Sequence, residues 1–157
     1  HYEEIVKACE QHQGTFFYAP NYSIGVNILF KLNQYLAQIM EQFEEYDPSI
    51  EEVHHIQKVD SPSGTAIKLA EQLIEKISRK HDWKEDVPGE KGTLNIHAVR
   101  EDQVPGIHTI TYDSEIDTVS IKHSAKSRKG FSLGAVLAAE FIKDKQGVYS
   151  MDDLLNL

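Results

Sequence analysis

The sequence has a single cysteine and no apolar run long enough to cross a membrane. One cysteine, Cys9, cannot form an intrachain disulfide, which fits a reducing compartment. A membrane helix needs roughly 18 apolar residues, whereas the apolar stretches near Ile28 and Val136 are interrupted by Asn, Lys or Glu. The opening segment HYEEIVKACEQHQG lacks the charged, apolar and small-residue pattern of a signal peptide. We therefore expect a cytoplasmic protein without a membrane partner.

Positive charge is also scarce. The 16 Lys and Arg residues stand against 25 Asp and Glu residues, which gives a formal net charge of −9. A field of that sign repels nucleic acid and anionic surfaces, so we expect no nucleic-acid partner. A small anion could bind only where basic residues gather. They gather in two places: His54, His55 and Lys58, and the segment KHSAKSRK with Lys122, His123, Lys126, Arg128 and Lys129.

The first twenty residues predict one helix and one strand. Residues 2–11 have the spacing of an amphipathic helix that stops at Gly14, and residues 15–20 resemble a short buried strand ended by Pro20. A lone helix and strand cannot close a core. We interpret them as the last αβ unit of a sheet whose other strands lie outside this chain. The alternative is that the strand pairs with later strands of the same chain.

The rest of the chain predicts an α+β block followed by a closing helix. In the predicted helix over 23–43, apolar residues recur at helical spacing: Ile28, Leu32, Leu36, Ile39 and Phe43, with Val26, Leu29 and Met40 widening the stripe. Helices are predicted over 23–43, 65–80 and 130–144, with one more helical turn after Ser150. Strands are predicted over 50–55, 93–101, 106–114 and 116–125, and a polar loop over 81–92.

The segment HHIQKVDSPSGTA, residues 54–66, is the densest in groups that can do chemistry. A histidine titrates near neutrality and can give or take a proton. Adjacent histidines on a strand point to opposite faces and therefore make a poor metal chelate. The histidines at 97, 108 and 123 have no spacing that ties them to this pair, so we predict no metal site.

The second half of that segment leads into a predicted helix. A helix start presents backbone N–H groups and a partial positive charge, Gly64 allows close approach, and the Thr65 hydroxyl adds a donor. The simpler alternative is that Ser63 or Thr65 only caps the helix. Together with Lys58, the segment predicts a site for a small carboxylate or phosphate, with proton transfer by His54 or His55.

These residues also resemble a known family. HHIQKVDSPSGTA fills every fixed position of the signature H-H-x-x-K-x-D-x-P-S-G-T-A of dihydrodipicolinate reductase, also called 4-hydroxy-tetrahydrodipicolinate reductase. The segments YAPNYSIGVN and IKHSAKSRKGFSLGAVLAAEFI resemble those leading out of and back into the family's nucleotide-binding domain. The family's G-x-G-x-x-G fingerprint is absent from this chain, so we expect most of the Rossmann domain to lie outside it.

The resemblance implies an α+β fold, with a mixed β-sheet flanked by helices and pieces of a Rossmann domain at both ends. The implied division is 1–22 for the end of the nucleotide-binding domain, 23–127 for the substrate-binding and oligomerisation domain, and 128–157 for the return segment. A homotetramer is implied as well.

The resemblance further implies NADH- or NADPH-dependent reduction of a small cyclic dicarboxylate in diaminopimelate and lysine biosynthesis. His54 and Lys58 match the family's proton donors, and His55, Gly64 and Thr65 match residues that bind the substrate carboxylate. The residues that match those near the cofactor are Ala19, Pro20, Asn21, Tyr22 and Arg128. Lacking most of the nucleotide-binding domain, the chain alone is expected to be inactive. The alternative function is a non-catalytic α+β module for small-anion binding or oligomerisation.

Overall fold

The computed structural model describes all residues, 1–157, and divides them into two compact units. The larger unit is residues 28–127, and the smaller unit joins residues 1–27 to residues 128–157. The larger unit is built on a five-stranded mixed sheet with the strand order β3-β4-β2-β5-β6. Its strands are β2 (Asp47–His54), β3 (Asp82–Glu85), β4 (Thr93–Arg100), β5 (Ile107–Asp113) and β6 (Thr118–Ser124). Strands β3, β4 and β2 run parallel, whereas β5 and β6 are antiparallel to their neighbours. The predicted α+β class with a mixed sheet flanked by helices is confirmed.

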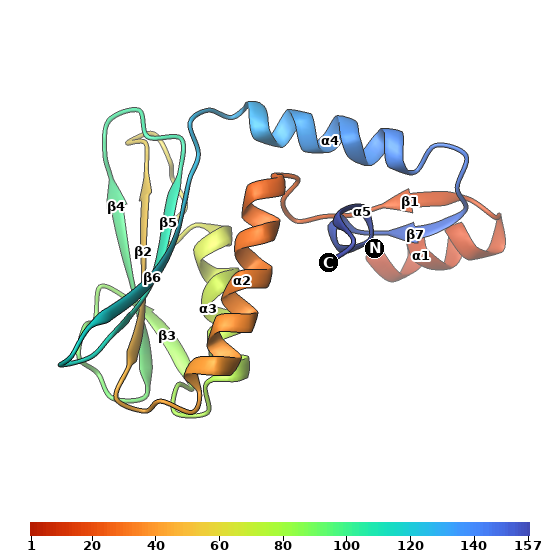
Figure 1. Ribbon diagram of the computed structural model, residues 1–157. Helices are drawn as coiled ribbons and strands as arrows, with labels where there is room; N and C mark the ends of the chain where they lie inside the picture. Colours follow the sequence, from red (N-terminus) through yellow and green to blue (C-terminus); the bar gives the residue numbers. More distant parts are fainter. The chain divides into compact units, whose positions relative to one another are not determined.

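Two helices, α2 (Ile24–Met40) and α3 (Gly64–Lys76), cover one face of this sheet (Figure 1). They are joined in the core by a buried polar contact, in which Asn33 Nδ2 donates to the Leu69 carbonyl and to Gln72 Oε1, each at 3.1 Å. Burying a polar side chain is costly unless it is hydrogen-bonded, so this pairing also fixes how the two helices face each other.

The apolar stripe predicted on α2 is only in part the side of the helix that is buried. Four of its members, Ile28, Leu32, Ile39 and Phe43, remain exposed. The buried side consists of three other members of the predicted stripe, Val26, Leu29 and Met40, together with Phe30, Asn33 and Ala37. Because α2 is apolar on two sides, periodicity alone could not tell which side packs inward.

The helix-covered face of the sheet changes character along the strands. One row across four paired strands, here called the isoleucine row, consists of Ile96, Ile50, Ile110 and Ile121. Two residues away on each strand, toward the carboxyl end of β2, lies the polar row, which consists of Ala98, Glu52, His108 and His123. Alternate residues of a strand share a face, so both rows face the helices. The polar row therefore lies where the sheet's dry core ends.

The smaller unit contains α1 (Tyr2–Gln11), β1 (Thr15–Phe17), α4 (Lys129–Phe141), β7 (Gly147–Tyr149) and α5 (Met151–Leu155). Strand β1 pairs in parallel with β7, so within this chain the first strand does find a later partner. Both phenylalanines of β1 are only half-buried, which corrects the prediction of a buried strand.

Two strands were missed from sequence. Strand β3 lies inside the segment predicted as a polar loop, because DWKE has only one apolar residue to reveal it. Strand β7 was not predicted because three residues are too few to show a period. In the same unit, Gly134 of α4 lies so close to the Tyr22 carbonyl that a built Cβ would be 1.7 Å from that oxygen, so only glycine fits there.

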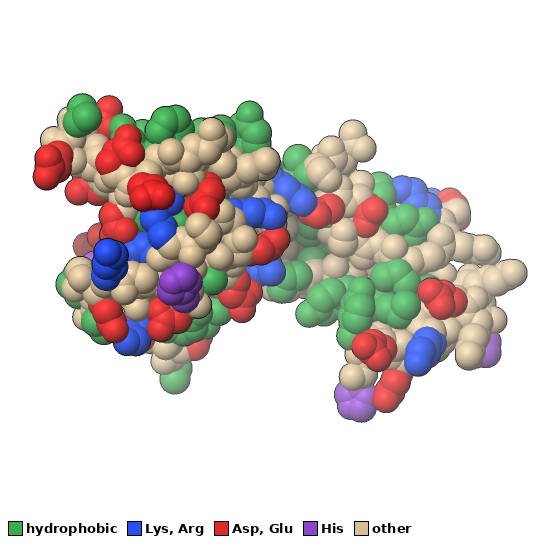
Figure 2. All heavy atoms as spheres, turned by 90° about the horizontal axis from the view of Figure 1, so that it is seen from below, with side chains coloured by type: hydrophobic (Ala, Val, Ile, Leu, Met, Phe, Trp, Pro, Cys, Tyr) green, Lys and Arg blue, Asp and Glu red, His purple; other side chains and the backbone are tan.

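None of the helices has both the length and the apolar character required to cross a membrane. Figure 2 shows Asp and Glu side chains scattered over both units on the face drawn, with Lys and Arg in small groups rather than one continuous basic patch. The distribution agrees with the net charge of −9.

Candidate functional site

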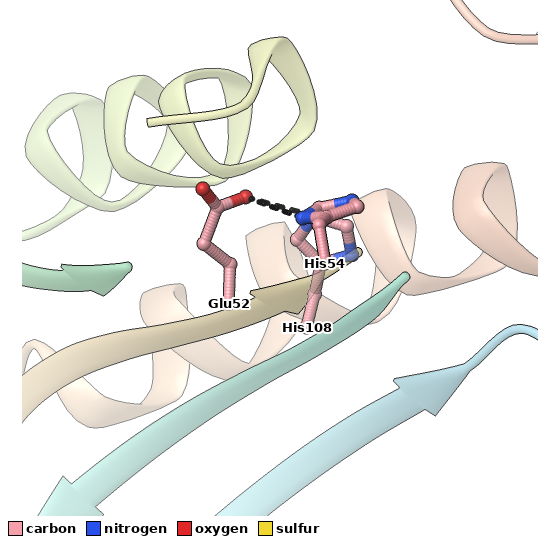
Figure 3. Close-up of side chains that lie close together, drawn as sticks. All are labelled: Glu52, His54 and His108. Carbon is pink, nitrogen blue, oxygen red and sulfur yellow. Dashed lines mark ion pairs between the residues drawn. The ribbon is translucent and has the colours of Figure 1, made fainter. Parts of the chain in front are cut away.

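The polar row brings together a carboxylate and two imidazoles (Figure 3). Glu52 and His54 leave the same face of β2, two residues apart, and His108 comes from the adjacent strand β5. Glu52 Oε2 lies 3.1 Å from His54 Nδ1 and 3.7 Å from His108 Nε2. All three residues are buried, and Glu52 is completely so. The end of β2 therefore carries an ionisable cluster in a place where most sheets carry apolar side chains.

The other oxygen of Glu52 is held by two donors. The Ser63 backbone N–H donates to Oε1 at 2.9 Å, and the Arg100 guanidinium donates to it at 3.2 Å. Burial raises the pKa of Glu52, but the polar groups of His108, His54 and Ser63 around its carboxylate together outweigh that effect and hold the pKa below its usual range. Glu52 is therefore a buried anion at neutral pH, and Arg100 is its counter-charge.

Arg100 also fastens the loop that carries the signature. Besides Glu52, its Nη2 donates to the Asp60 carbonyl at 2.8 Å and to Ser61 Oγ at 3.1 Å. A guanidinium is a rigid planar fork with several donors, which suits it to hold a side chain and a loop at once. The loop between β2 and α3 is thus anchored on the strand beside β2.

His108 is the deeper of the two imidazoles. Its Nε2 lies 3.1 Å from Ser63 Oγ, and its ring meets that of His54 nearly edge-on with 5.1 Å between centroids. Burial lowers the pKa of His108, and the nearby Glu52 offsets only part of that effect. His123, its cross-strand partner, has a pKa lowered by burial as well. His108 is therefore neutral at pH 7.

The predicted substrate residues occupy the loop after β2. His55 directly follows the strand and is half-buried, and its carbonyl accepts a hydrogen bond from the Lys58 backbone N–H at 3.0 Å. This turn bends the chain directly after β2. Lys58 Nζ is bound to both carboxylate oxygens of Asp60 at 2.7 Å, and this hydrogen bond lowers the pKa of Asp60.

Helix α3 begins at the predicted anion cradle. Ser63 is the N-cap, since its Oγ accepts from the Ala66 N–H at 3.2 Å, which decides between the two candidate caps. Gly64 has no atom within 4 Å of a built Cβ, so the first turn of the helix faces open space there. Thr65 follows and is half-buried. An open helix start can accept an anion.

The residues predicted to lie near the cofactor belong to the smaller unit. The Ser23 N–H donates to Asn21 Oδ1 at 2.9 Å, and Asn27 Nδ2 donates to the Asn21 carbonyl at 2.8 Å. These bonds hold the turn before α2 in a defined shape. Arg128 is the N-cap residue of α4, in helical conformation and exposed. The five predicted positions are Ala19, Pro20, Asn21, Tyr22 and Arg128.

Glu52, His54 and His108 also offer ligand atoms that all lie within 4.8 Å of one another, a spacing that a metal ion could use. However, Arg100 already balances the charge of Glu52, and Ser63 Oγ already lies beside His108 Nε2. A cation there would have to displace or oppose these partners. The arrangement is better described as an ion-paired proton-carrying cluster.

Three members of this cluster were not identified from sequence: Glu52, Arg100 and His108. The alternation of β2 could have placed Glu52 on the same face as His54. His108 was noted, but no spacing linked it to the histidine pair, because the link is the antiparallel register of β2 with β5. Arg100 is tied to the site by the parallel pairing of β4 with β2, where it is opposite His54.

Comparisons with known proteins agree on one family. The family described as "Dihydrodipicolinate reductase, C-terminus" matches residues 25–155. A 4-hydroxy-tetrahydrodipicolinate reductase from Christiangramia forsetii is 50% identical over 155 residues, covering 99% of this chain and 64% of that protein. The enzyme of the same name from Methanosarcina acetivorans is 42% identical over 146 residues, covering 88% of this chain and 53% of that protein.

A solved structure has the same fold. The dipicolinate-bound dihydrodipicolinate reductase from Paenisporosarcina sp. TG-14 superposes with a TM-score of 0.68 at 24% identity, covering 95% of this chain and 57% of that one. The chain spans between about half and two thirds of the length of these relatives. The family match and the sequence identities together place the chain in the dihydrodipicolinate reductase family, as a C-terminal portion of such a protein.

Proposed function

We propose that the complete protein reduces 4-hydroxy-tetrahydrodipicolinate, or its dehydrated form dihydrodipicolinate, to tetrahydrodipicolinate with NADH or NADPH. The step would serve diaminopimelate and lysine biosynthesis. The proposal rests on the buried His54 imidazole at the carboxyl end of β2 and on the open start of α3, which are joined by the short loop that carries Lys58. The names of the relatives and the dipicolinate bound to the structural neighbour support the same substrate class.

Each predicted site residue has a role in this proposal. The dinucleotide supplies the hydride. His54 delivers the proton that completes the reduction. Lys58 is the second proton donor. Its charge attracts the dianionic substrate, which replaces Asp60 as the partner of Lys58 Nζ. His55, Gly64 and Thr65 hold a carboxylate at the start of α3, where backbone N–H groups and the helix dipole favour an anion.

The cofactor residues fit a limited part of a dinucleotide. We propose that the turn 19–22 and Arg128 face its nicotinamide end, because Asn21 and the close approach of Gly134 to Tyr22 give that turn a fixed, partly exposed shape. No glycine-rich phosphate loop occurs in the chain, so these residues do not account for pyrophosphate binding. We therefore expect this chain alone to be inactive.

Calorimetry with pyridine-2,6-dicarboxylate, a planar analogue, tests the substrate site. We expect the 157-residue chain to bind it weakly, at millimolar concentration, and Lys58→Ala to weaken that binding. Lys76→Ala is the matched control, because Lys76 pairs with Glu75 and lies in the last turn of α3, at the other end of that helix from Gly64. If Lys58→Ala and the parent chain bound the analogue equally well, the anion-binding role would be wrong.

The complete enzyme then separates catalysis from binding alone. Reduction of the substrate by NADH or NADPH supports the reductase, and binding of the analogue without any turnover supports the non-catalytic anion-binding module. Lys58→Ala in the complete enzyme should lower the rate and raise KM, because it removes both a proton donor and a charge. Normal steady-state kinetics in that variant would contradict both roles.

We also propose that the protein is a homotetramer that associates through the open face of the sheet. That face carries exposed or half-buried residues of β2, β5 and β6, such as Glu51, Thr109 and Lys122, which pair in one row across the three strands. Light scattering should give four times the mass of one chain. A monomeric mass would contradict the oligomerisation role of this domain.

A further inference from the structure

We propose that Glu52 is the positioning residue of His54: its carboxylate fixes the imidazole in the form protonated at Nδ1, so that Nε2 is the atom that exchanges the substrate proton. This role rests on the proposed function for its benefit to catalysis, but the orientation itself is a property of this chain. The ion pair of Glu52 with Arg100 would then hold the carboxylate that orients His54, in addition to balancing its charge.

The geometry around Nδ1 leaves it one partner. His54 Nδ1 and Glu52 Oε2 are both buried, each lacks an in-line hydrogen bond, and they lie 3.1 Å apart. A buried polar atom without a partner is costly, so each atom favours the other. An ionised carboxylate oxygen only accepts hydrogen bonds, and Nδ1 must therefore carry the hydrogen. Catalytic hydrogen bonds are often poorly aligned before a ligand binds, and a small ring rotation would align this one.

The carboxylate is itself prevented from turning away. Its Oε1 accepts from the Ser63 N–H and from Arg100, so Oε2 is left to face the rings. His108 is the weaker competitor, since its Nε2 is 3.7 Å from Oε2 and 3.1 Å from Ser63 Oγ. The cluster therefore orients His54 rather than His108.

A glycine packs against the far side of the His54 ring. A Cβ built on Gly106 would lie 3.0 Å from His54 Nε2, and the residue has a φ of +151°, which side-chain-bearing residues rarely adopt. The Ala125 N–H donates to the Gly106 carbonyl at 2.9 Å and holds this segment in place. A side chain at this position would therefore crowd Nε2. The glycine keeps such a side chain away from the atom that exchanges the proton.

The test uses the tautomer of His54, which can be observed without substrate or cofactor. Long-range ¹H–¹⁵N spectra of the ¹⁵N-histidine-labelled chain at alkaline pH distinguish a neutral imidazole protonated at Nδ1 from one protonated at Nε2. His54→Gln assigns the signal by removing it. We expect His54 in the parent chain to be protonated at Nδ1, and the opposite tautomer would overturn the proposal.

Glu52→Gln should invert that tautomer. The amide oxygen of Gln would stay with the two donors, Ser63 N–H and Arg100, so its NH2 group would face His54 as a donor and Nδ1 would have to accept. Glu71→Gln is the control, because Glu71 is an exposed carboxylate of α3 that pairs with Lys68 and should leave the tautomer unchanged. An unchanged tautomer in Glu52→Gln would also overturn the proposal.

Glu52→Asp separates positioning from simple packing. Asp keeps an acceptor-only carboxylate but loses one methylene, whereas Gln keeps the volume but gains a donor. Positioning predicts that Asp retains the Nδ1-protonated tautomer and Gln does not, while a packing role predicts that Asp is the more disruptive change. If Gln does not fold, the Asp variant alone decides, since a folded Asp variant protonated at Nε2 contradicts the proposal.

Kinetics of the complete enzyme complete the test. Glu52→Gln should lower kcat by no more than the roughly 10²-fold expected for losing His54 itself, with KM little changed, because the carboxylate acts through His54. Glu52→Asp should recover part of that loss. A complete protein with no reductase activity, but with the tautomer inverted by Glu52→Gln, would disprove the proposed function and leave the positioning role standing.

Discussion

Two neighbouring rows on the same face of the sheet differ in their chemistry: one is apolar, and the other holds buried ionisable side chains. The isoleucine row and the polar row lie two residues apart on each strand, and both are covered by α2 and α3. The isoleucine row gains free energy from burial, about 25 cal/mol per Å² of apolar surface. The polar row must offset the desolvation of Glu52 with a guanidinium, a backbone N–H and two imidazoles. Stability alone would have favoured another apolar row. The free-energy cost of burying Glu52 therefore indicates that this row serves a function.

The largest expected effect is on the isoleucine row. Ile110 is fully buried, so Ile110→Ala should cost about 2–5 kcal/mol of unfolding free energy through lost burial and a cavity. Denaturation followed by the fluorescence of Trp83, the only tryptophan, reports on this unit. Ile116→Ala is the control, since Ile116 is 86% exposed and should change stability by less than about 0.5 kcal/mol. Equal effects of the two variants would contradict the division into core and periphery.

The next effect is on the polar row and concerns rate rather than stability. His54→Gln should lower kcat of the complete enzyme about 10²-fold, equivalent to about 2.7 kcal/mol of barrier, as for a lost general acid. The Trp83-reported midpoint should move far less than in Ile110→Ala. His81→Gln is the control, because His81 is exposed and precedes the amino end of β3. An unchanged rate in His54→Gln would disprove its role as proton donor.

The sequence predicted the elements whose patterns are local and missed those that depend on contacts between distant residues. Helices α2, α3 and α4, strands β4 to β6 and the signature loop were found because their patterns are local. Strand β3 was missed because its pattern is polar, and the inward side of α2 was ambiguous because the helix is apolar on two sides. The smaller unit's β1–β7 pair joins residues from the two ends of the chain, a contact that no local period reveals.

The candidate site was found only in its sequential part. His54, His55, Lys58, Gly64 and Thr65 lie within a dozen residues, and the signature names them together. The supporting cluster depends on pairing register, because Arg100 is opposite His54 on β4 and His108 is opposite Glu52 on β5. Register is set by the whole sheet and cannot be read from one strand.

A smaller effect should distinguish the rows by pH. Burial lowers the pKa of His108, so the unfolded chain binds its proton more tightly than the folded one. The neutral His108 ring contributes fully to folding stability above its unfolded pKa, about 6.5. This contribution is lost as the pH falls through its lower pKa in the folded state. The groups facing it are Glu52, His54 and His123.

Thermal midpoints between pH 8 and pH 5 measure this dependence. We expect stability to fall with acid, and His108→Gln to make the fall shallower, because one proton-linked group is removed. Glu52, whose pKa is also lowered, contributes a further loss only below about pH 4.5, so it leaves the upper window to the histidines. A pH slope that was the same with and without His108 would show that its protonation does not differ between the folded and unfolded states.

The smallest effect on stability is expected at Ser63, which both caps α3 and contacts the polar row. Ser63 caps α3 through the Ala66 N–H and also holds His108 Nε2, so Ser63→Ala should cost about 1 kcal/mol, the usual value for a lost N-cap. Ser150→Ala removes the comparable cap of α5 in the other unit and should leave the Trp83-reported midpoint unchanged. If Ser63→Ala destabilised the larger unit as much as Ile110→Ala, the polar row would be as essential to the core as the isoleucine row. A loss of about 1 kcal/mol of unfolding free energy would mean instead that the polar row can change while the sheet keeps its fold. The candidate site would then be energetically separable from the core.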